Sequence, residues 1–249
     1  MINFSEINAS SVAGKCLRAG LSALPGGLVV PILQGPTRGY RWILGSSTHG
    51  CWLGSFELEK QRVFRSLVTP GAIIYDIGAN VGVYTLLGSK LVGPSGHVYA
   101  FEPLPRNLRL LHRHLKLNNL QNVTAIEKAI SDCDGFAAFK VEEDYSAASL
   151  SSSGDLTVET ITLDHAFSAM ALRPPCVLKV DVEGAEAQVL AGAKTLLSLH
   201  RPAVLLATHG QNHHRDCCEM LRSCGYKLSS ITGGNAEESD ELLAVPAQA

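Results

Sequence analysis

An apolar run in the first third of the chain ends in an acid and is followed by two glycines four residues apart. The acid is Asp76, and the glycines are Gly78 and Gly82. Apolar residues at helical spacing come next, so the pattern predicts a buried strand, a tight turn and a helix start. Such a turn lets a ligand approach the backbone, and the helix start suits an anionic group. Asp76 suits a cationic or hydroxyl-bearing group, so we expect a zwitterionic ligand.

Three more chemistry-bearing residues follow predicted strands, namely Glu102, Asp181 and His209. In an open parallel sheet, ligands bind at the carboxyl ends of the strands, so these side chains should face one crevice. Glu102 is placed to accept hydrogen bonds from a ribose diol. Histidine titrates near neutral pH, so we predict His209 as the base for a hydroxyl nucleophile. Asp181 would orient His209 or bind that hydroxyl.

Other chemistries fit these residues less well. A dinucleotide turn requires Gly-x-Gly-x-x-Gly, which residues 78–82 do not match, and no P-loop is present. Lys179 and Glu186 have an equally good structural interpretation, in which they pair and cap a helix. A metal cluster of His209, His213, His214 and Asp216 is not predicted, because Gly210 argues against a helix that begins before His209.

The predicted elements alternate between strand and helix. This order predicts an α/β, Rossmann-like fold with a seven-stranded, mostly parallel sheet and helices on both faces. Residues 1–69 would be an N-terminal extension, either a cap over the site or a structural lead-in, and residues 70–249 the main domain. We expect strands at 28–33, 40–44, 71–76, 97–101, 123–126, 135–141, 158–163, 177–180, 203–207, 226–231 and 241–245, and helices at 57–68, 81–91, 105–118, 164–170, 185–199 and 213–224.

Four local expectations can be checked directly. Residues 1–24 are weakly patterned, and residues 142–154 are rich in serine and acids and predict a loop. Asp164 is expected to cap the helix that follows it. His112 and His114 are expected on the exposed face of their helix.

Composition excludes several classes of protein. A formal net charge of −2 over 249 residues shows no basic bias, so nucleic acid is not an expected partner. No apolar run approaches the roughly 20 residues that span a bilayer, and no signal peptide is evident. The 7 cysteines are odd in number and form no Cys-x-x-Cys pair, which favours reduced thiols in the cytoplasm.

Three blocks together resemble one family. Residues 76–82 (Asp-Ile-Gly-Ala-Asn-Val-Gly), 101–103 (Phe-Glu-Pro) and 178–186 (Leu-Lys-Val-Asp-Val-Glu-Gly-Ala-Glu) are similar to those of FkbM-type methyltransferases. The resemblance covers about residues 71–231. It implies a class I enzyme that transfers a methyl group from S-adenosyl-L-methionine, leaving S-adenosyl-L-homocysteine, to a hydroxyl of a small molecule such as a natural product or glycan. N-methylation and a non-catalytic binding module remain open, and a nicotinamide oxidoreductase fits less well.

The resemblance also implies roles for individual residues. Asp181 and His209 would face the methyl group and the acceptor. The cofactor would contact Asp181 together with Glu57, Asp76, Gly78, Ala79, Asn80, Gly82, Tyr84, Thr85, Glu102, Pro103, Ala129 and Ile130. Among these, Glu102 would hold the ribose hydroxyls, and Ala129 and Ile130 would flank the adenine.

Overall fold

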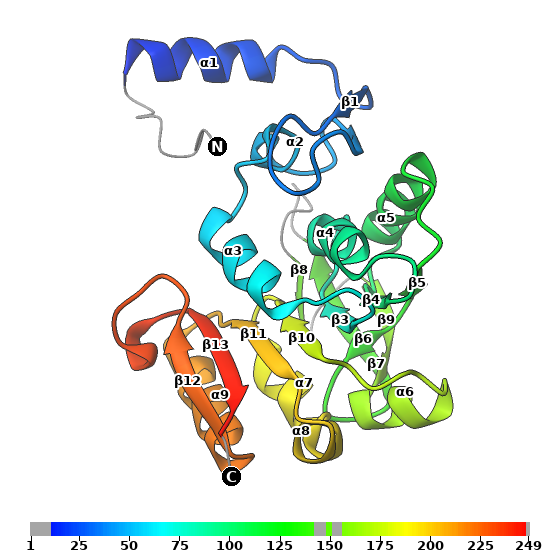
Figure 1. The fold of residues 1–249 in the computed structure, drawn as a ribbon, viewed down its shortest axis with the longest axis vertical. Coiled ribbons are helices and arrows are strands. Elements are labelled where there is room, and N and C mark those ends of the chain that lie inside the picture. The colour runs from blue at the N-terminus through cyan, green and yellow to red at the C-terminus, as the bar shows by residue number, and fades with distance from the viewer. Residues whose placement is uncertain (1–10, 142–147, 151–155, 248–249) are drawn as a thin grey trace.

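A seven-stranded sheet forms the centre of the molecule, in the order β12-β13-β11-β10-β3-β4-β5 (Figure 1). The computed structural model describes residues 11–141, 148–150 and 156–247. Strands β11, β10, β3, β4 and β5 pair in parallel, and β13 is antiparallel to both of its neighbours. The strands are β3 (Ile73–Ile77), β4 (His97–Phe101), β5 (Val123–Ile126), β10 (Val177–Val180), β11 (Ala203–Ala207), β12 (Tyr226–Ser230) and β13 (Glu241–Pro246). The predicted Rossmann-like α/β class is confirmed.

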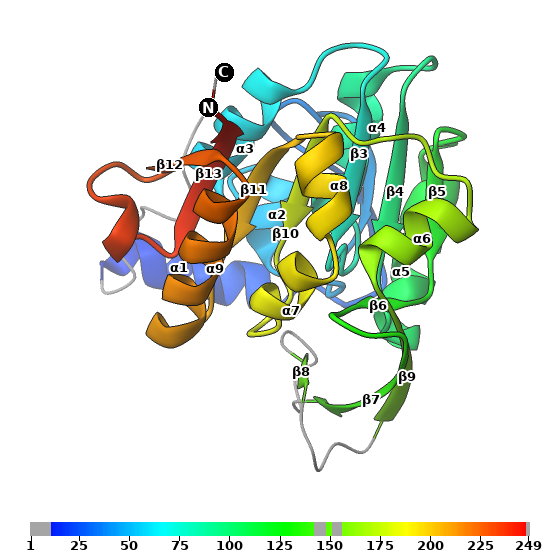
Figure 2. The same cartoon turned by 90° about the horizontal axis from the view of Figure 1, so that it is seen from below.

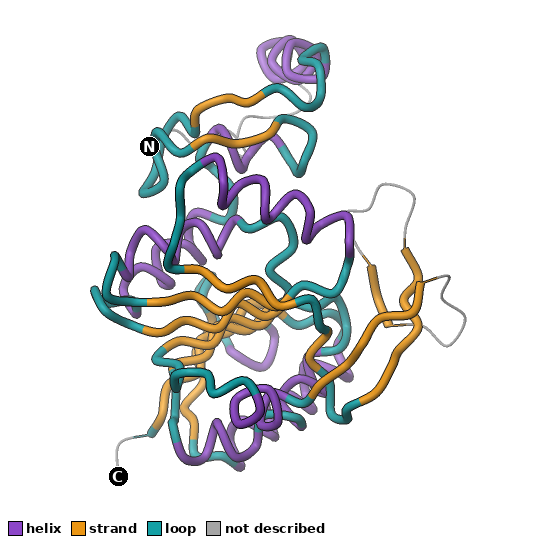
Figure 3. The backbone as a smooth tube through the Cα atoms, turned by 90° about the vertical axis from the view of Figure 1, so that its right-hand side faces the viewer, coloured by secondary structure: helices purple, strands orange, loops and turns teal. Residues whose placement is uncertain are grey.

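Helices cover both faces of this sheet (Figure 3). One face packs against α3 (Leu58–Leu67), α4 (Val83–Val92) and α5 (Pro105–Leu117). The other packs against α6 (Leu163–Ala169), α7 (Glu186–Ala191), α8 (Lys194–Leu199) and α9 (Gln211–Ser223). Both faces are therefore dry, which explains why the parallel strands read as short, continuous apolar runs.

Side-chain alternation along β3 decides where its acid points. Tyr75 and Ile77 lie in the core with α7, α8 and α9, whereas Ile74 lies in the core with α3 and α4. Because successive strand residues point to opposite faces, Asp76 shares the face of Ile74. Lys179 is its partner in register on β10. The sequence thus places a carboxylate and an ammonium side by side beneath α3 and α4.

A second, smaller sheet stands beside the main one, in the order β6-β9-β7-β8 (Figure 2). Its strands are β6 (Ala129–Ile130), β7 (Gly135–Val141), β8 (Ala148–Leu150) and β9 (Leu156–Ile161). The predicted loop over 142–154 is wrong in part, because β8 pairs antiparallel with β7. Residues 142–147 and 151–154 of that prediction lie outside the described residues.

The N-terminal residues contain more regular structure than their weak pattern indicated. Helix α1 (Val12–Ser22) begins at Ser11, whose hydroxyl accepts a hydrogen bond from the Gly14 N–H at 3.0 Å. A hairpin of β1 (Val29–Pro31) and β2 (Arg41–Ile43) follows, and then α2 (His49–Leu53). Short polar caps and tertiary packing can form helices that a weak apolar pattern does not reveal.

His114 joins this N-terminal part to the main domain, and its predicted exposure is wrong. The ring stacks on Trp42 with centroids 4.1 Å apart, and His114 is fully buried. Its Nε2 accepts from the Ile43 N–H at 3.1 Å, so Nδ1 carries the proton and donates to the Val81 carbonyl at 2.8 Å. Burial lowers the pKa of His114 to about 4. His112 is exposed as predicted.

Two predicted details of the helices are also wrong. Thr162, not Asp164, caps α6, while both Asp164 carboxylate oxygens accept backbone N–H groups at the start of α8. The predicted helix 185–199 is divided into α7 and α8 at Gly192, where an added Cβ would lie 2.0 Å from the Ser131 carbonyl oxygen. Contacts distant in sequence decide both features.

Two further observations bear on the compositional expectations. No helix in the described part of the chain is long and apolar enough to cross a bilayer. Six of the cysteines are described with free thiols, and Cys217 and Cys218 are fully buried in the core.

Candidate functional site

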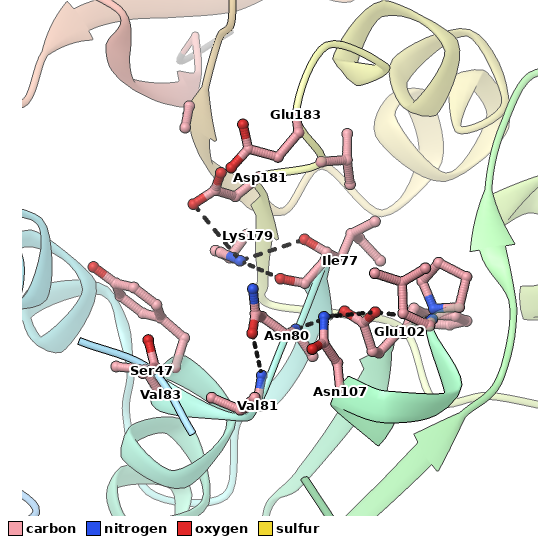
Figure 4. A pocket seen from close by; sticks show the side chains of 18 of the residues that line it. Ser47, Ile77, Asn80, Val81, Val83, Glu102, Asn107, Lys179, Asp181 and Glu183 are labelled. Atoms are coloured by element: carbon pink, nitrogen blue, oxygen red, sulfur yellow. Dashed lines mark hydrogen bonds and ion pairs between the residues drawn. The ribbon is translucent and has the colours of Figure 1, made fainter. Parts of the chain in front are cut away.

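A cavity of about 660 Å³ opens at the carboxyl ends of β3, β4, β10 and β11. This is the edge at which parallel α/β sheets bind ligands, and the volume is typical of small-molecule sites. Figure 4 shows acidic, basic and amide side chains converging on it. Besides the strand ends, the lining comes from the N-terminal segment 45–49, the loop before α3, and the small sheet, which contributes Ala129, Ile130, Phe139 and Thr160.

Glu102 organises the turn after β3. Its Oε2 accepts from the Asn80 N–H at 2.7 Å, and its Oε1 accepts from the Leu104 N–H at 2.9 Å. The side chain is 4% exposed, and burial raises the pKa of Glu102 against the opposing effect of these donors. Asn107 Nδ2 adds a longer hydrogen bond to Oε1, at 3.4 Å. Oε2 keeps a second lone pair, so Glu102 lines the cavity as an acceptor with capacity to spare.

The two glycines of the turn serve packing more than ligand access. Gly78 has φ of 73°, and a Cβ there would lie 1.9 Å from the Asp181 carbonyl oxygen. Gly82 has φ of 101°, and a Cβ there would meet Leu111 at 2.6 Å. Both residues must therefore be glycine for β3 to approach β10 and for α4 to approach α5. Gly78 lines the cavity, whereas Gly82 lies behind it.

Three residues with unusual backbone geometry line the cavity. Glu57, Asn80 and Glu183 have φ of 45°, 51° and 55°, in the left-handed region that non-glycine residues rarely adopt. The described residues include only six non-glycine positions with positive φ, so half of them are at this site. Such geometry costs of order 1–3 kcal/mol per residue and is held only where the surroundings enforce it.

Asp76 lies beneath the cavity, not in its wall. It is 1% exposed, with Oδ1 3.2 Å from the Lys179 ammonium and Oδ2 accepting from the Thr85 hydroxyl at 2.6 Å. Lys179 also donates to the Gly78 carbonyl at 2.9 Å and lines the cavity. The structural interpretation in which Lys179 pairs with Glu186 is therefore wrong, because Lys179 pairs with Asp76.

Lys60 brings a second buried ammonium to the site from the N-terminal segment. It lies 3.2 Å from Asp181 Oδ2, 2.9 Å from Glu241 Oε1 and 3.7 Å from Glu57 Oε2. Burial alone would lower the pKa of Lys60, but these three carboxylates raise it well above its usual value. Burial alone would raise the pKa of Asp181, but Lys179 and Lys60 hold it below its usual value.

Tyr84 lies beside both lysines. Its ring centroid lies 5.8 Å from Lys60 Nζ and 5.6 Å from Lys179 Nζ, within the range of cation–π attraction. Its hydroxyl donates to Glu57 Oε2 at 2.8 Å, and burial together with Glu57 raises the pKa of Tyr84 strongly. Tyr84 thus stays a neutral donor and orients Glu57 at the cavity wall.

His209 lies between two glutamates and close to Asp181. Its Nδ1 donates to Glu186 Oε1 at 2.7 Å, and its Nε2 lies 3.3 Å from Glu183 Oε2. Glu186 is fully buried and also accepts from the Gly184 N–H at 2.9 Å. The hydrogen bond to Glu186 and the nearby charges of Glu183 and Asp181 raise the pKa of His209 to about 9 against the effect of burial.

The structure brings most of the predicted site residues together. Asp76, Gly82 and Thr85 lie outside the wall, whereas the wall includes Glu57, Gly78, Ala79, Asn80, Tyr84, Glu102, Pro103, Ala129, Ile130, Asp181 and His209. Helix α9 begins after Gly210, so His209 is not on the same helix as His213, His214 and Asp216. His214 instead lies beside Cys218 and Glu237.

Sequence reasoning missed Lys60 and Glu241. Lys60 is four residues before buried Phe64, so it shares a helix face with the core, and a lysine on an apolar face was a usable signal. Glu241 begins the last strand, and nothing local distinguishes it from a solvated acid.

Comparison with known proteins decides the family. The FkbM methyltransferase domain matches residues 76–228. The chain belongs to the FkbM family of S-adenosylmethionine-dependent methyltransferases. Among curated proteins, the chain is similar to the hexuronic acid methyltransferase AglP of Haloferax volcanii, with 28% identity over 170 residues and coverage of 67% of each chain.

Solved structures support the same fold. An FkbM methyltransferase from Methylobacillus flagellatus aligns with a TM-score of 0.51 and 17% identity, over 79% of this chain and 52% of that one. The chain thus spans about half the length of that relative. An S-adenosylmethionine-dependent O-methyltransferase from Thermotoga maritima aligns with a TM-score of 0.50 and 13% identity, over 93% of this chain and 82% of that one.

Proposed function

We propose that the protein transfers a methyl group from S-adenosyl-L-methionine to a hydroxyl oxygen of a small molecule. The observation that carries the proposal is the strand-end cavity in which Glu102 and Asp181 face each other across the turn 78–82. A sugar hydroxyl is the favoured acceptor, because the similar archaeal protein is a hexuronic acid methyltransferase.

The charges of the cavity fit the proposed cofactor. Around Asp181, the two buried lysines Lys60 and Lys179 lie 2.9–3.9 Å from four carboxylates, those of Asp76, Asp181, Glu57 and Glu241. Among the described residues of the wall, the other basic side chains, Arg106 and Lys128, form no ion pair with this group. The local excess of negative charge around Asp181 suits a ligand with an ammonium and a sulfonium group. S-adenosyl-L-methionine supplies a methyl group on a positively charged sulfur and leaves as the neutral thioether S-adenosyl-L-homocysteine.

The roles within the cavity follow from position. Glu102 would accept the ribose hydroxyls at Oε2, and Asn80 and Tyr84 would flank the amino-acid end. Ala129 and Ile130 would hold the adenine, together with Phe139, which is buried in the same wall. Asp76 and Thr85 would not contact the cofactor but would hold Lys179 in the cavity wall. Gly82 would set the position at which α4 begins.

The acceptor would arrive at Asp181 and His209. As its oxygen attacks, the new O–C bond forms while the C–S bond breaks, and the hydroxyl proton must leave. The groups placed to receive it are the Asp181 carboxylate and His209 Nε2 in the neutral imidazole, which a pKa of about 9 makes the minor form at neutral pH. Residues 45–49 of the N-terminal segment line the cavity, so we propose that the extension 1–69 caps the domain 70–249. We also propose a reducing, cytoplasmic setting, which the free thiols support.

Cofactor binding can be measured separately from methyl transfer to the acceptor. Isothermal titration should detect S-adenosyl-L-homocysteine binding to the wild type and no NAD binding. Glu102→Gln should weaken binding by about tenfold or more, because an amide cannot accept from Asn80 N–H, Leu104 N–H and a ribose diol together. Glu238→Gln, in an exposed turn, is the matched control. NAD binding, or equal affinity in both variants, would contradict the assignment.

A further inference from the structure

The acceptor side of the cavity holds three side chains with the donor atoms of a metal site. One ligand atom from each of Asp181, Glu183 and His209 lies within 4.8 Å of the others. Figure 4 shows the carboxylates of Asp181 and Glu183 side by side at the cavity wall. Two carboxylates and one imidazole suit Mn²⁺ or Mg²⁺-like cations, and three protein ligands leave coordination positions open.

The orientation of His209 is what distinguishes this cluster from a chance group of acids. Its Nδ1 donates to Glu186 Oε1 at 2.7 Å, which directs Nε2 toward Glu183 at 3.3 Å. Metal-binding histidines characteristically donate their other ring nitrogen to a carboxylate in this way, because it sets the tautomer and the ring plane. Glu186 is itself anchored by the Gly184 N–H at 2.9 Å.

Charge balance points the same way. Glu186 is fully buried, and its Oε2 has no hydrogen-bond partner among the described residues. Both lysine contacts of Asp181 use Oδ2, at 3.2 Å and 3.9 Å, so Oδ1 is the oxygen that can turn to a cation. A positive charge at His209 stabilises the buried Glu186 carboxylate, and a cation bound at Nε2 in place of the proton supplies that charge.

We propose that Asp181, Glu183 and His209 bind one divalent cation of the Mn²⁺ or Mg²⁺ type, with Glu186 orienting His209. The inference rests on the proposed function, because the open coordination positions would take the acceptor hydroxyl. The cation lowers the pKa of that hydroxyl, and its proton leaves to solvent. This arrangement favours acceptors with two adjacent oxygens, such as a sugar diol, because both can coordinate.

Mn²⁺ binding to the chelator-treated full-length protein tests the proposal, with the free-ion electron paramagnetic resonance signal as the readout. We expect one Mn²⁺ per chain, bound at least tenfold more weakly by Glu183→Gln, a half-exposed position whose replacement keeps the fold. Glu237→Gln is the matched control, because Glu237 belongs to the other described cluster, with His214 and Cys218. Circular dichroism checks that both variants are folded.

Each result has one meaning. Loss of Mn²⁺ binding in Glu183→Gln but not in Glu237→Gln supports the site. No Mn²⁺ binding by the wild type, or loss only in Glu237→Gln, overturns it. S-adenosyl-L-homocysteine titration of the same metal-free wild type keeps the two proposals apart. If the protein binds S-adenosyl-L-homocysteine but not Mn²⁺, the cation site is contradicted and the proposed function stands. If it does not bind S-adenosyl-L-homocysteine, the proposed function is contradicted.

Discussion

His114 and His209 are the same residue type in opposite electrostatic surroundings. His114 is buried between a backbone N–H, a backbone carbonyl and the Trp42 ring, so only its neutral form fits. His209 lies among Glu183, Glu186 and Asp181 at the cavity, where a positive charge is stabilised. The pKa of His114 is lowered to about 4, and that of His209 is raised to about 9. The difference supports a structural role for His114 and agrees with the proposal that His209 acts on the acceptor.

Replacing His209 should produce the largest effect. His209→Ala is expected to lower kcat by about 100-fold or more, because it removes the group that orders the acceptor side. S-adenosyl-L-homocysteine affinity should change less than about threefold. The measurements are methyl transfer to a panel of sugars and isothermal titration of the product. A parallel loss of S-adenosyl-L-homocysteine affinity would contradict the separation of acceptor and cofactor sides.

Replacing His114 should affect stability instead. His114→Ala leaves the Ile43 N–H and the Val81 carbonyl unsatisfied and removes the stack on Trp42. We expect a loss of about 3 kcal/mol in the free energy of unfolding, measured by urea denaturation. Activity per folded molecule should persist. Unchanged stability would show that the N-terminal hairpin does not depend on this contact.

The low pKa of His114 predicts a pH dependence of stability. The unfolded chain protonates this histidine near 6.5, whereas the folded chain does so only near 4. The unfolded state therefore binds more protons in that window, and stability falls as pH falls from 6.5 toward 4, by up to about 3 kcal/mol. Urea denaturation of the wild type and of His114→Phe over this range gives the test. Equal slopes in the two proteins would assign the effect to other groups.

The smallest effect is expected from replacing His112, two residues before His114. His112 lies on the same helix, α5, but is exposed. His112→Ala should change the free energy of unfolding by less than about 0.5 kcal/mol. If His112→Ala lowered the free energy of unfolding as much as His114→Ala, the loss would come from the change in the helix itself and not from the buried contacts of His114.

The sheet was predictable because its signal is local. Strands 97–101, 123–126, 177–180 and 203–207 of the main sheet, and 135–141 of the small sheet, have the same bounds in the structure as in the prediction. Short apolar runs between glycines and polar tips carry that information within a few residues. Because the strands are parallel, the sequence alone predicts that Glu102, Asp181 and His209 lie at the same edge of the sheet.

Long-range contacts account for what was missed. Asp164 was expected to cap its own helix, but the start of α8, 30 residues later, takes its carboxylate. His114 looked like a surface residue because its partners, Ile43 and Trp42, are about 70 residues earlier. Two of the three acids around Lys60, Asp181 and Glu241, lie 121 and 181 positions away from it. No short window of sequence contains these distant pairs, so only the folded chain reveals them.

The Lys60 contacts also bear on how this protein diverges from its relatives. Lys60 and Glu241 lie outside the matched region 76–228, yet Lys60 pairs with Asp181 within it and Glu241 pairs with Lys60. The charge around Asp181 is therefore set partly by two flanking segments that relatives need not share. Substitutions in these flanking segments would change the charge around Asp181 without altering the matched blocks themselves.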